Sequence, residues 1–132
     1  TLIHIDYRLD NMMFGGPYPL TVIDWQSIAY GCGMNDASYF VGTSIDTSVR
    51  AENDEYLLRE YYNELSTYDV NLSWDECWQY YCHNAPAGLI MAVIASMIVG
   101  ETKRGNEMFM MMAHRSSKMC QDLDAIEVVK SG

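Results

Sequence analysis

Two short apolar segments, each carrying acidic or amide side chains, constrain this chain more than any other feature. The first leads into HIDYRLDN (residues 4–11), and the second is LTVID (20–24). A charged group beside β-branched and aromatic neighbours is costly to bury unless something compensates it. The glycines and prolines of FGGPYP (14–19) predict a hairpin turn between the segments. Antiparallel pairing would bring Asn11 and Asp24 close together.

The rest of the chain has the patterns of helices. A short strand is expected over residues 1–5, and after YGCG the hydrophobic period changes to that of a helix. Asn35 or Asp36 is expected to cap the first helix. Five helices are predicted, over residues 35–45, over 50–65, from the Ser73–Glu76 capping box to an interruption at Pro86, over 87–99, and over 107–123. The predicted fold class is α+β, mostly helical.

Length and composition are those of one globular domain. The chain has 132 residues, of which 49% are hydrophobic and 20% charged. The apolar run 87–99 has thirteen residues, fewer than the roughly 18–20 that span a bilayer, so it predicts a buried helix. The five methionines of 107–123 are expected to pack into the core.

Charge and cysteine content restrict the partners. A net charge of −10 argues against nucleic acid and anionic membranes, which need clustered positive charge. It slightly favours a cationic or neutral small molecule. Four cysteines without a C-x-x-C pair indicate reduced thiols and a cytoplasmic location.

Asp6, Asn11 and Asp24 are the residues that carry candidate chemistry. Carboxylate and amide oxygens are ligands that Mg²⁺ prefers, and the ion commonly binds through one or two carboxylates plus substrate phosphates. A carboxylate that is not used on the metal can accept a proton from a hydroxyl group. This division of roles is typical of phosphoryl transfer from ATP.

These segments resemble a known superfamily. HIDYRLDN followed by TVIDW resembles the signature H-G-D-x-x-x-x-N, then hydrophobic-I-D-W/F, of the aminoglycoside phosphotransferase and choline kinase superfamily. YGCGMNDASYFVGTSI and MCQDLDAIEVV are similar to its ecdysteroid-kinase-like branch. The resemblance implies an ATP-dependent kinase of small-molecule hydroxyl groups. It also implies that residues 1–132 form the C-terminal lobe of a protein-kinase-like fold.

The resemblance assigns roles to individual residues. Asp6 would be the catalytic base. Asn11 and Asp24 would hold Mg²⁺ on the ATP phosphates. His4 would brace the loop without reacting, and Asp36 would accept backbone N–H groups from that loop.

Two residues of the loop leave alternatives open. Arg8 either faces the transferred phosphate or is a surface arginine that pairs with Asp10. Ile5 stands where the family usually has glycine, and a β-branched residue there is strained if the backbone needs a positive φ. This departure motivates an alternative, in which the protein is a non-catalytic kinase-like binding or regulatory module. A Mg²⁺-dependent hydrolase using the same acids is a third possibility.

A kinase of this kind also needs a phosphate-covering loop and a strand lysine. Neither is found before Lys103, so an ATP-covering N-terminal lobe is expected upstream of Thr1. The 132 residues alone are then expected to bind ATP poorly and to be inactive. The sequence leaves the identity of the acceptor open.

Overall fold

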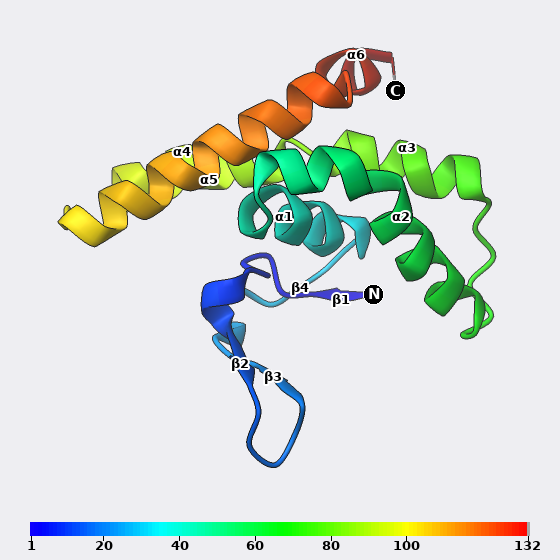
Figure 1. Cartoon of the computed structure of the whole chain (residues 1–132), viewed down its shortest axis with the longest axis horizontal. Helices are drawn as coiled ribbons and strands as arrows, with labels where there is room; N and C mark the ends of the chain where they lie inside the picture. The colour runs from blue at the N-terminus through cyan, green and yellow to red at the C-terminus, as the bar shows by residue number, and fades with distance from the viewer. Residues whose placement is uncertain (132) are drawn as a thin grey trace.

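The computed structural model describes residues 1–131, which form a mostly helical α+β fold (Figure 1). The strands are β1 (Leu2–Ile3), β2 (Met12–Phe14), β3 (Leu20–Val22) and β4 (Ala29–Tyr30), and the 3-10 turns are η1 (Leu9–Asn11) and η2 (Trp25–Ser27). The helices are α1 (Met34–Ser44), α2 (Thr47–Ser66), α3 (Trp74–Asn84), α4 (Ala87–Ile98), α5 (Lys103–Asp122) and α6 (Ala125–Ser131). The β2–β3 hairpin projects away from the helices (Figure 1).

The predicted hairpin is confirmed. β2 and β3 pair antiparallel, with Met12 opposite Val22. Gly15 and Gly16 both have positive φ, at 84° and 81°, a backbone that glycine adopts without strain. Within residues 1–5, where one strand was predicted, only β1 forms. It pairs with β4, a strand that was not predicted.

The helix starts agree in part with the predicted caps. The Ser73–Glu76 capping box is present at the start of α3. The expected cap of α1 by Asn35 or Asp36 is wrong, because Gly33 is the N-cap and the Asp36 carboxylate is engaged by the loop of residues 4–11.

Helix boundaries follow caps and breaks. α2 begins earlier than expected because Asp46 accepts the Ser48 N–H at 3.1 Å. α5 likewise begins at Lys103, capped by Thr102. The interruption at Pro86 is confirmed, since α3 ends and α4 begins on either side of it. α6 was not predicted.

Two clusters of buried side chains form the core. The larger one joins α1, α2, α3, α5 and the residues after α5. Its buried members are Met34, Val41, Leu58, Cys77, Tyr81, Cys82, Ala85, Met119, Cys120 and Ala125. The smaller cluster joins α1, α4 and α5 through Tyr39, Ala92 and Met112.

A buried polar network ties α2 to its neighbours. The Arg50 guanidinium pairs with the carboxylates of Asp54 and Asp122. The Tyr81 hydroxyl of α3 donates to Asp54 at 2.5 Å. Each charge is therefore partnered, as burial demands.

The expectation that residues 87–99 form a buried helix is wrong for most of its side chains. Gly88 and Ala92 are buried, whereas Met97 and Ile98 are 80% and 77% exposed. α4 packs through its small residues, because a Cβ at Gly88 would collide with Ser116 of α5. By length and composition the 25-residue stretch Trp74–Ile98 could cross a membrane, and 28% of its most apolar window is buried.

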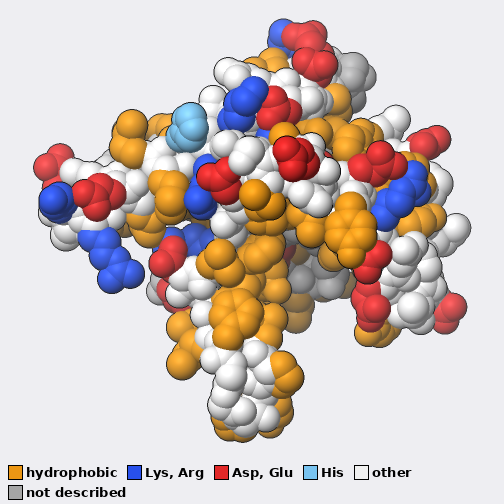
Figure 2. All heavy atoms as spheres, in the orientation of Figure 1, with side chains coloured by type: hydrophobic (Ala, Val, Ile, Leu, Met, Phe, Trp, Pro, Cys, Tyr) orange, Lys and Arg blue, Asp and Glu red, His pale blue; other side chains and the backbone are white. Residues whose placement is uncertain are grey.

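Other apolar side chains are also exposed. The expected methionine core holds only in part, since Met112 and Met119 are buried while Met110 and Met111 are exposed. Hydrophobic side chains are also exposed on the projecting hairpin (Figure 2). Phe14 of β2 is 68% exposed.

Candidate functional site

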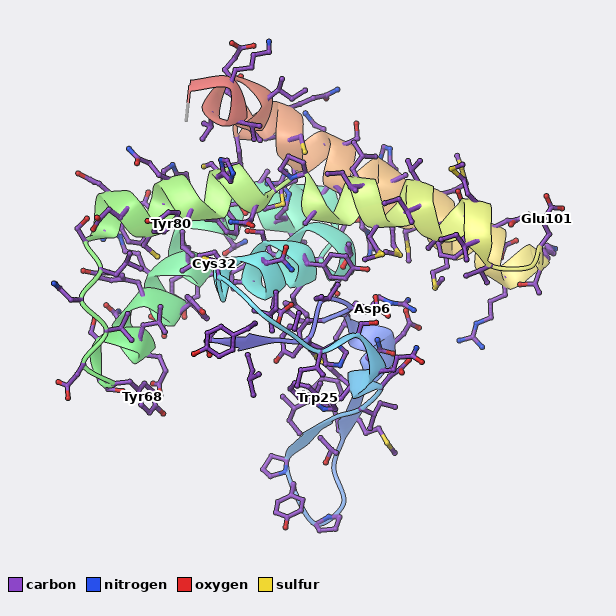
Figure 3. All side chains as sticks on the ribbon, turned by 180° about the vertical axis from the view of Figure 1, so that it is seen from behind. Asp6, Trp25, Cys32, Tyr68, Tyr80 and Glu101 are labelled. Atoms are coloured by element: carbon purple, nitrogen blue, oxygen red, sulfur yellow. The ribbon has the colours of Figure 1, made fainter. Side chains whose placement is uncertain are left out.

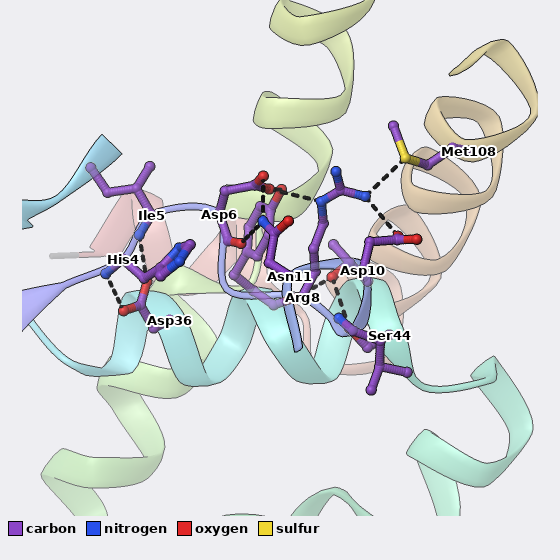
Figure 4. A network of polar contacts seen from close by, with 12 residues as sticks. His4, Ile5, Asp6, Arg8, Asp10, Asn11, Asp36, Ser44 and Met108 are labelled. Atoms are coloured by element: carbon purple, nitrogen blue, oxygen red, sulfur yellow. Dashed lines mark hydrogen bonds and ion pairs between the residues drawn. The ribbon is translucent and has the colours of Figure 1, made fainter. Parts of the chain in front are cut away.

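The loop of residues 4–11 is fixed to α1 by one carboxylate. Asp36 accepts the His4 N–H on Oδ2 at 2.6 Å and the Ile5 N–H on Oδ1 at 2.9 Å (Figure 4). Charge-assisted hydrogen bonds of this kind are stronger than neutral ones. At the other end of the loop, the Leu9 N–H donates to the Ser44 hydroxyl at 3.2 Å.

Ile5 has a left-handed backbone, with φ of 71°. A β-branched residue is strained there, because its side chain crowds the following carbonyl. The backbone strain that was considered because Ile5 replaces the family's usual glycine is therefore present. The two hydrogen bonds to Asp36 hold this conformation.

His4 connects the loop to the end of β3. Its ring is 1% exposed and donates from Nε2 to the Ile23 carbonyl at 2.8 Å. The Trp25 ring lies 4.7 Å away, centre to centre. His4 thus links the loop through a buried ring to the residue that follows β3.

The Asp6 carboxylate is the centre of a polar network (Figure 4). Its Oδ1 accepts the Tyr39 hydroxyl at 2.8 Å and Arg8 Nε at 3.0 Å. Its Oδ2 accepts Asn11 Nδ2 at 2.9 Å, and the same amide donates to the Asp6 carbonyl at 2.8 Å. A carboxylate has about four acceptor sites. Oδ1 therefore has both of its sites filled, and Oδ2 keeps one.

Arg8 has two acidic partners, which bears on its two interpretations. Besides Asp6, it contacts Asp10 at 2.8 Å, so the pairing with Asp10, one of the two alternatives, is present. The guanidinium is also 2.8 Å from the Met108 sulfur of α5, and the Arg8 side chain is only 17% exposed. Arg8 therefore links the loop to α5.

Asn11 and Asp24 are brought together through the backbone of the hairpin. The Ile23 N–H donates to the Asn11 carbonyl at 2.9 Å, and Asp24 is the next residue, with φ of 63°. Asn11 uses its amide nitrogen on Asp6, which leaves its side-chain oxygen available.

The donor chemistry at this position fits Mg²⁺ held together with phosphates. The Asp24 side chain is exposed and has no hydrogen-bond or ionic partner within residues 1–131. In this described region, no group of three or more His, Cys, Asp or Glu side chains could hold a metal. An ion bound by Asn11 and Asp24 would therefore need substrate oxygens to complete its coordination.

A cavity of about 400 Å³ opens beside Asp6. Figure 3 shows Asp6 on the loop between the hairpin and the helices. The polar and ionisable lining residues are Asp6, Arg8, Gln26, Ser27 and Tyr39. The apolar lining comes from α4 and α5, through Met91, Ile94, Ala95, Ile98, Val99, Met108, Phe109 and Met112. Pockets of this size and polarity are typical of small-molecule sites.

Sequence reasoning missed Tyr39 and the walls of this cavity. Tyr39 lies three residues after Asp36 on the same helix face, a spacing that offered a signal. The α4 and α5 residues were assigned to the core, because an apolar face has the same pattern whether it meets a neighbour or a cavity.

Comparison with known proteins decides the family. The sequence profile described as the ecdysteroid kinase-like family matches residues 1–73, more than half of the chain. The chain belongs to the ecdysteroid kinase-like family. The match spans the loop, the hairpin, α1 and α2, and so includes every residue of the polar network except Met108. No curated protein and no solved structure matches the chain. Membership of the ecdysteroid kinase-like family identifies a kinase-like protein and supports phosphotransfer as its general chemistry.

Proposed function

We propose that this protein transfers the γ-phosphoryl group of ATP to a hydroxyl of a small molecule, with Asp6 as the base. The observation that carries the proposal is the Asp6 carboxylate, held by three donors at the mouth of a largely apolar cavity. Its side chain keeps 28% exposure, so an acceptor can reach it.

In the proposed reaction the acceptor hydroxyl donates to Asp6 and loses its proton there. The acceptor oxygen forms a bond to the γ-phosphorus, the bond from that phosphorus to the β–γ bridging oxygen breaks, and ADP leaves. Asn11 and Asp24 would hold Mg²⁺, which when bound neutralises charge on the phosphates. Arg8, already beside Asp6, would face the phosphate that is transferred.

The cavity favours a neutral acceptor with an apolar framework. Its walls are mostly aliphatic and thioether side chains, and its one carboxylate already pairs with Arg8. A cationic acceptor would gain little there, although the overall charge of −10 permits one. We also propose that a lobe outside these 132 residues grips the nucleotide.

One observation favours a second candidate, a non-catalytic kinase-like binding module. Ile5 stands where the family usually has glycine and has φ of 71°, so the loop departs from the family's pattern at the residue before Asp6. The two candidates differ in whether ATP is consumed.

The test is phosphoryl transfer from labelled ATP to a panel of hydroxyl compounds, with and without Mg²⁺. It uses the full-length protein, and the 132-residue chain as a second sample. Kinase activity predicts a phosphate ester of the acceptor, formed only with Mg²⁺ and lost in Asp24→Ala. Binding of acceptors without any ester supports the module, and Mg²⁺-dependent release of phosphate from an added phosphate ester in the absence of ATP supports a hydrolase.

A further inference from the structure

We infer that Tyr39 is a positioning residue that saturates Oδ1 of Asp6 and so leaves Oδ2 as the atom that accepts the hydroxyl proton. The inference rests on the proposed function, because it deepens the account of the same base. It concerns a residue outside the motif of residues 4–11.

The geometry distinguishes the two carboxylate oxygens. Among the described residues 1–131, Oδ1 receives two donors, the Tyr39 hydroxyl and Arg8 Nε, whereas Oδ2 receives one, Asn11 Nδ2. Two donors fill the two lone-pair sites of one carboxylate oxygen. An arriving acceptor hydroxyl therefore finds its hydrogen-bond site on Oδ2, next to the residue expected to bind the metal.

Packing fixes the position of the Tyr39 side chain. Its side chain is 1% exposed and packs with Ala92 of α4 and Met112 of α5. The phenol is thus held by three helices, whereas Arg8 divides its donors between Asp6 and Asp10. Burial, and next the nearby Asp6 carboxylate, raise the pKa of Tyr39 far above its usual value. The hydroxyl therefore stays protonated and acts as a donor.

The same packing links the base to the cavity. Tyr39 lines the cavity, and so do Met91 and Met112, with which it shares the smaller core cluster. A shift of α4 or α5 would move the phenol and, through its hydrogen bond, turn the Asp6 carboxylate. The packing of α4 and α5 therefore helps to set the orientation of the Asp6 carboxylate, together with the loop that carries Asp6.

The test is a double-mutant cycle on phosphoryl transfer in the full-length protein. Tyr39→Phe keeps the ring and removes one charge-assisted donor, so we expect kcat to fall about tenfold with the KM for ATP unchanged. In the Asp6→Asn background, the same substitution is expected to cause no further loss, because its partner is already altered.

Tyr81→Phe is the matched control. It also removes a buried tyrosine hydroxyl that donates to an aspartate, Asp54, but lies in the larger core cluster. It is expected to lower the melting temperature without changing kcat. Equal melting temperatures of Tyr39→Phe and Tyr81→Phe would make their kcat values directly comparable.

The outcomes separate the inference from the proposed function. An unchanged kcat in Tyr39→Phe, or a tenfold loss that persists in the Asp6→Asn background, overturns the inference alone. If Asp6→Asn transfers phosphate like wild type, the proposed function is overturned, and the role of Tyr39 with it.

Discussion

Asp36 accepts the backbone N–H of Ile5 at 2.9 Å and so holds a β-branched residue at φ of 71°. The same carboxylate accepts the His4 N–H at 2.6 Å. An acid on α1, 31 residues along the chain, therefore fixes the backbone that immediately precedes the proposed base.

Replacing Asp36 by alanine should release this loop. Two N–H groups lose a charged acceptor, so we expect the free energy of unfolding to fall by about 2–3 kcal/mol. Urea unfolding measures it. Asp46→Ala removes an exposed helix cap and should lower the free energy of unfolding by less. Equal losses in the two variants would contradict the anchoring role of Asp36.

Ile5→Gly should relieve strain. Glycine adopts positive φ freely, so we expect the free energy of unfolding to rise by about 1 kcal/mol. Ile45→Gly is the control, because Ile45 has an ordinary extended backbone with φ of −100° and should be destabilised by the change. A loss of stability in Ile5→Gly similar to that in Ile45→Gly would show that no strain is stored at Ile5.

The hairpin and the capping box were predictable because their signals are local. Gly15 and Gly16 define the turn, and Ser73 is answered by Glu76 three residues later. The loop anchor was implied only by resemblance, since nothing near Asp36 indicates that it reaches the backbone of residues 4 and 5.

The cavity and the hydrogen bond from Tyr39 to Asp6 were not predictable, because both depend on segments that are far apart in the chain. Hydrophobic period identifies the apolar faces of α4 and α5, but it carries no information about what covers them. Whether Met91 meets a neighbouring helix or a cavity depends on packing between distant segments. The hydrogen bond from Tyr39 to Asp6 likewise joins residues 33 positions apart.

Filling the cavity should weaken acceptor binding alone. Ala95 lines the cavity, and Ala95→Phe would occupy part of its volume. We expect the acceptor KM to rise about tenfold or more with the ATP KM unchanged, because one poorly fitted group in an apolar pocket costs 1–3 kcal/mol. Steady-state kinetics measure both constants. The adjacent Ser96 is outside the cavity lining, and Ser96→Phe should leave both values unchanged; a rise there would point to general disturbance of α4.

The Ser73–Glu76 capping box should contribute to the loss of stability of the protein at acidic pH. Hydrogen bonds from Ser73 lower the pKa of Glu76 below its usual range. Its stabilising contribution is therefore present above the unfolded-state pKa and is lost as the pH falls through the lower, folded-state pKa. Glu76→Gln should lose less stability than wild type between pH 5 and about pH 3. Parallel stability curves for the two proteins would contradict this assignment.

The most direct test of the proposed role of Asp6 compares phosphoryl transfer by the Asp6→Asn variant with phosphoryl transfer by the Asp10→Asn variant. Both substitutions remove an acid that pairs with Arg8, but only Asp6 lies against Tyr39 and the cavity. Losing a general base costs about 10²–10⁴ in rate, so Asp6→Asn should lose at least about 100-fold in kcat and keep its ATP binding. Asp10→Asn should remain within a few-fold of wild type. Wild-type kcat in Asp6→Asn would contradict the account.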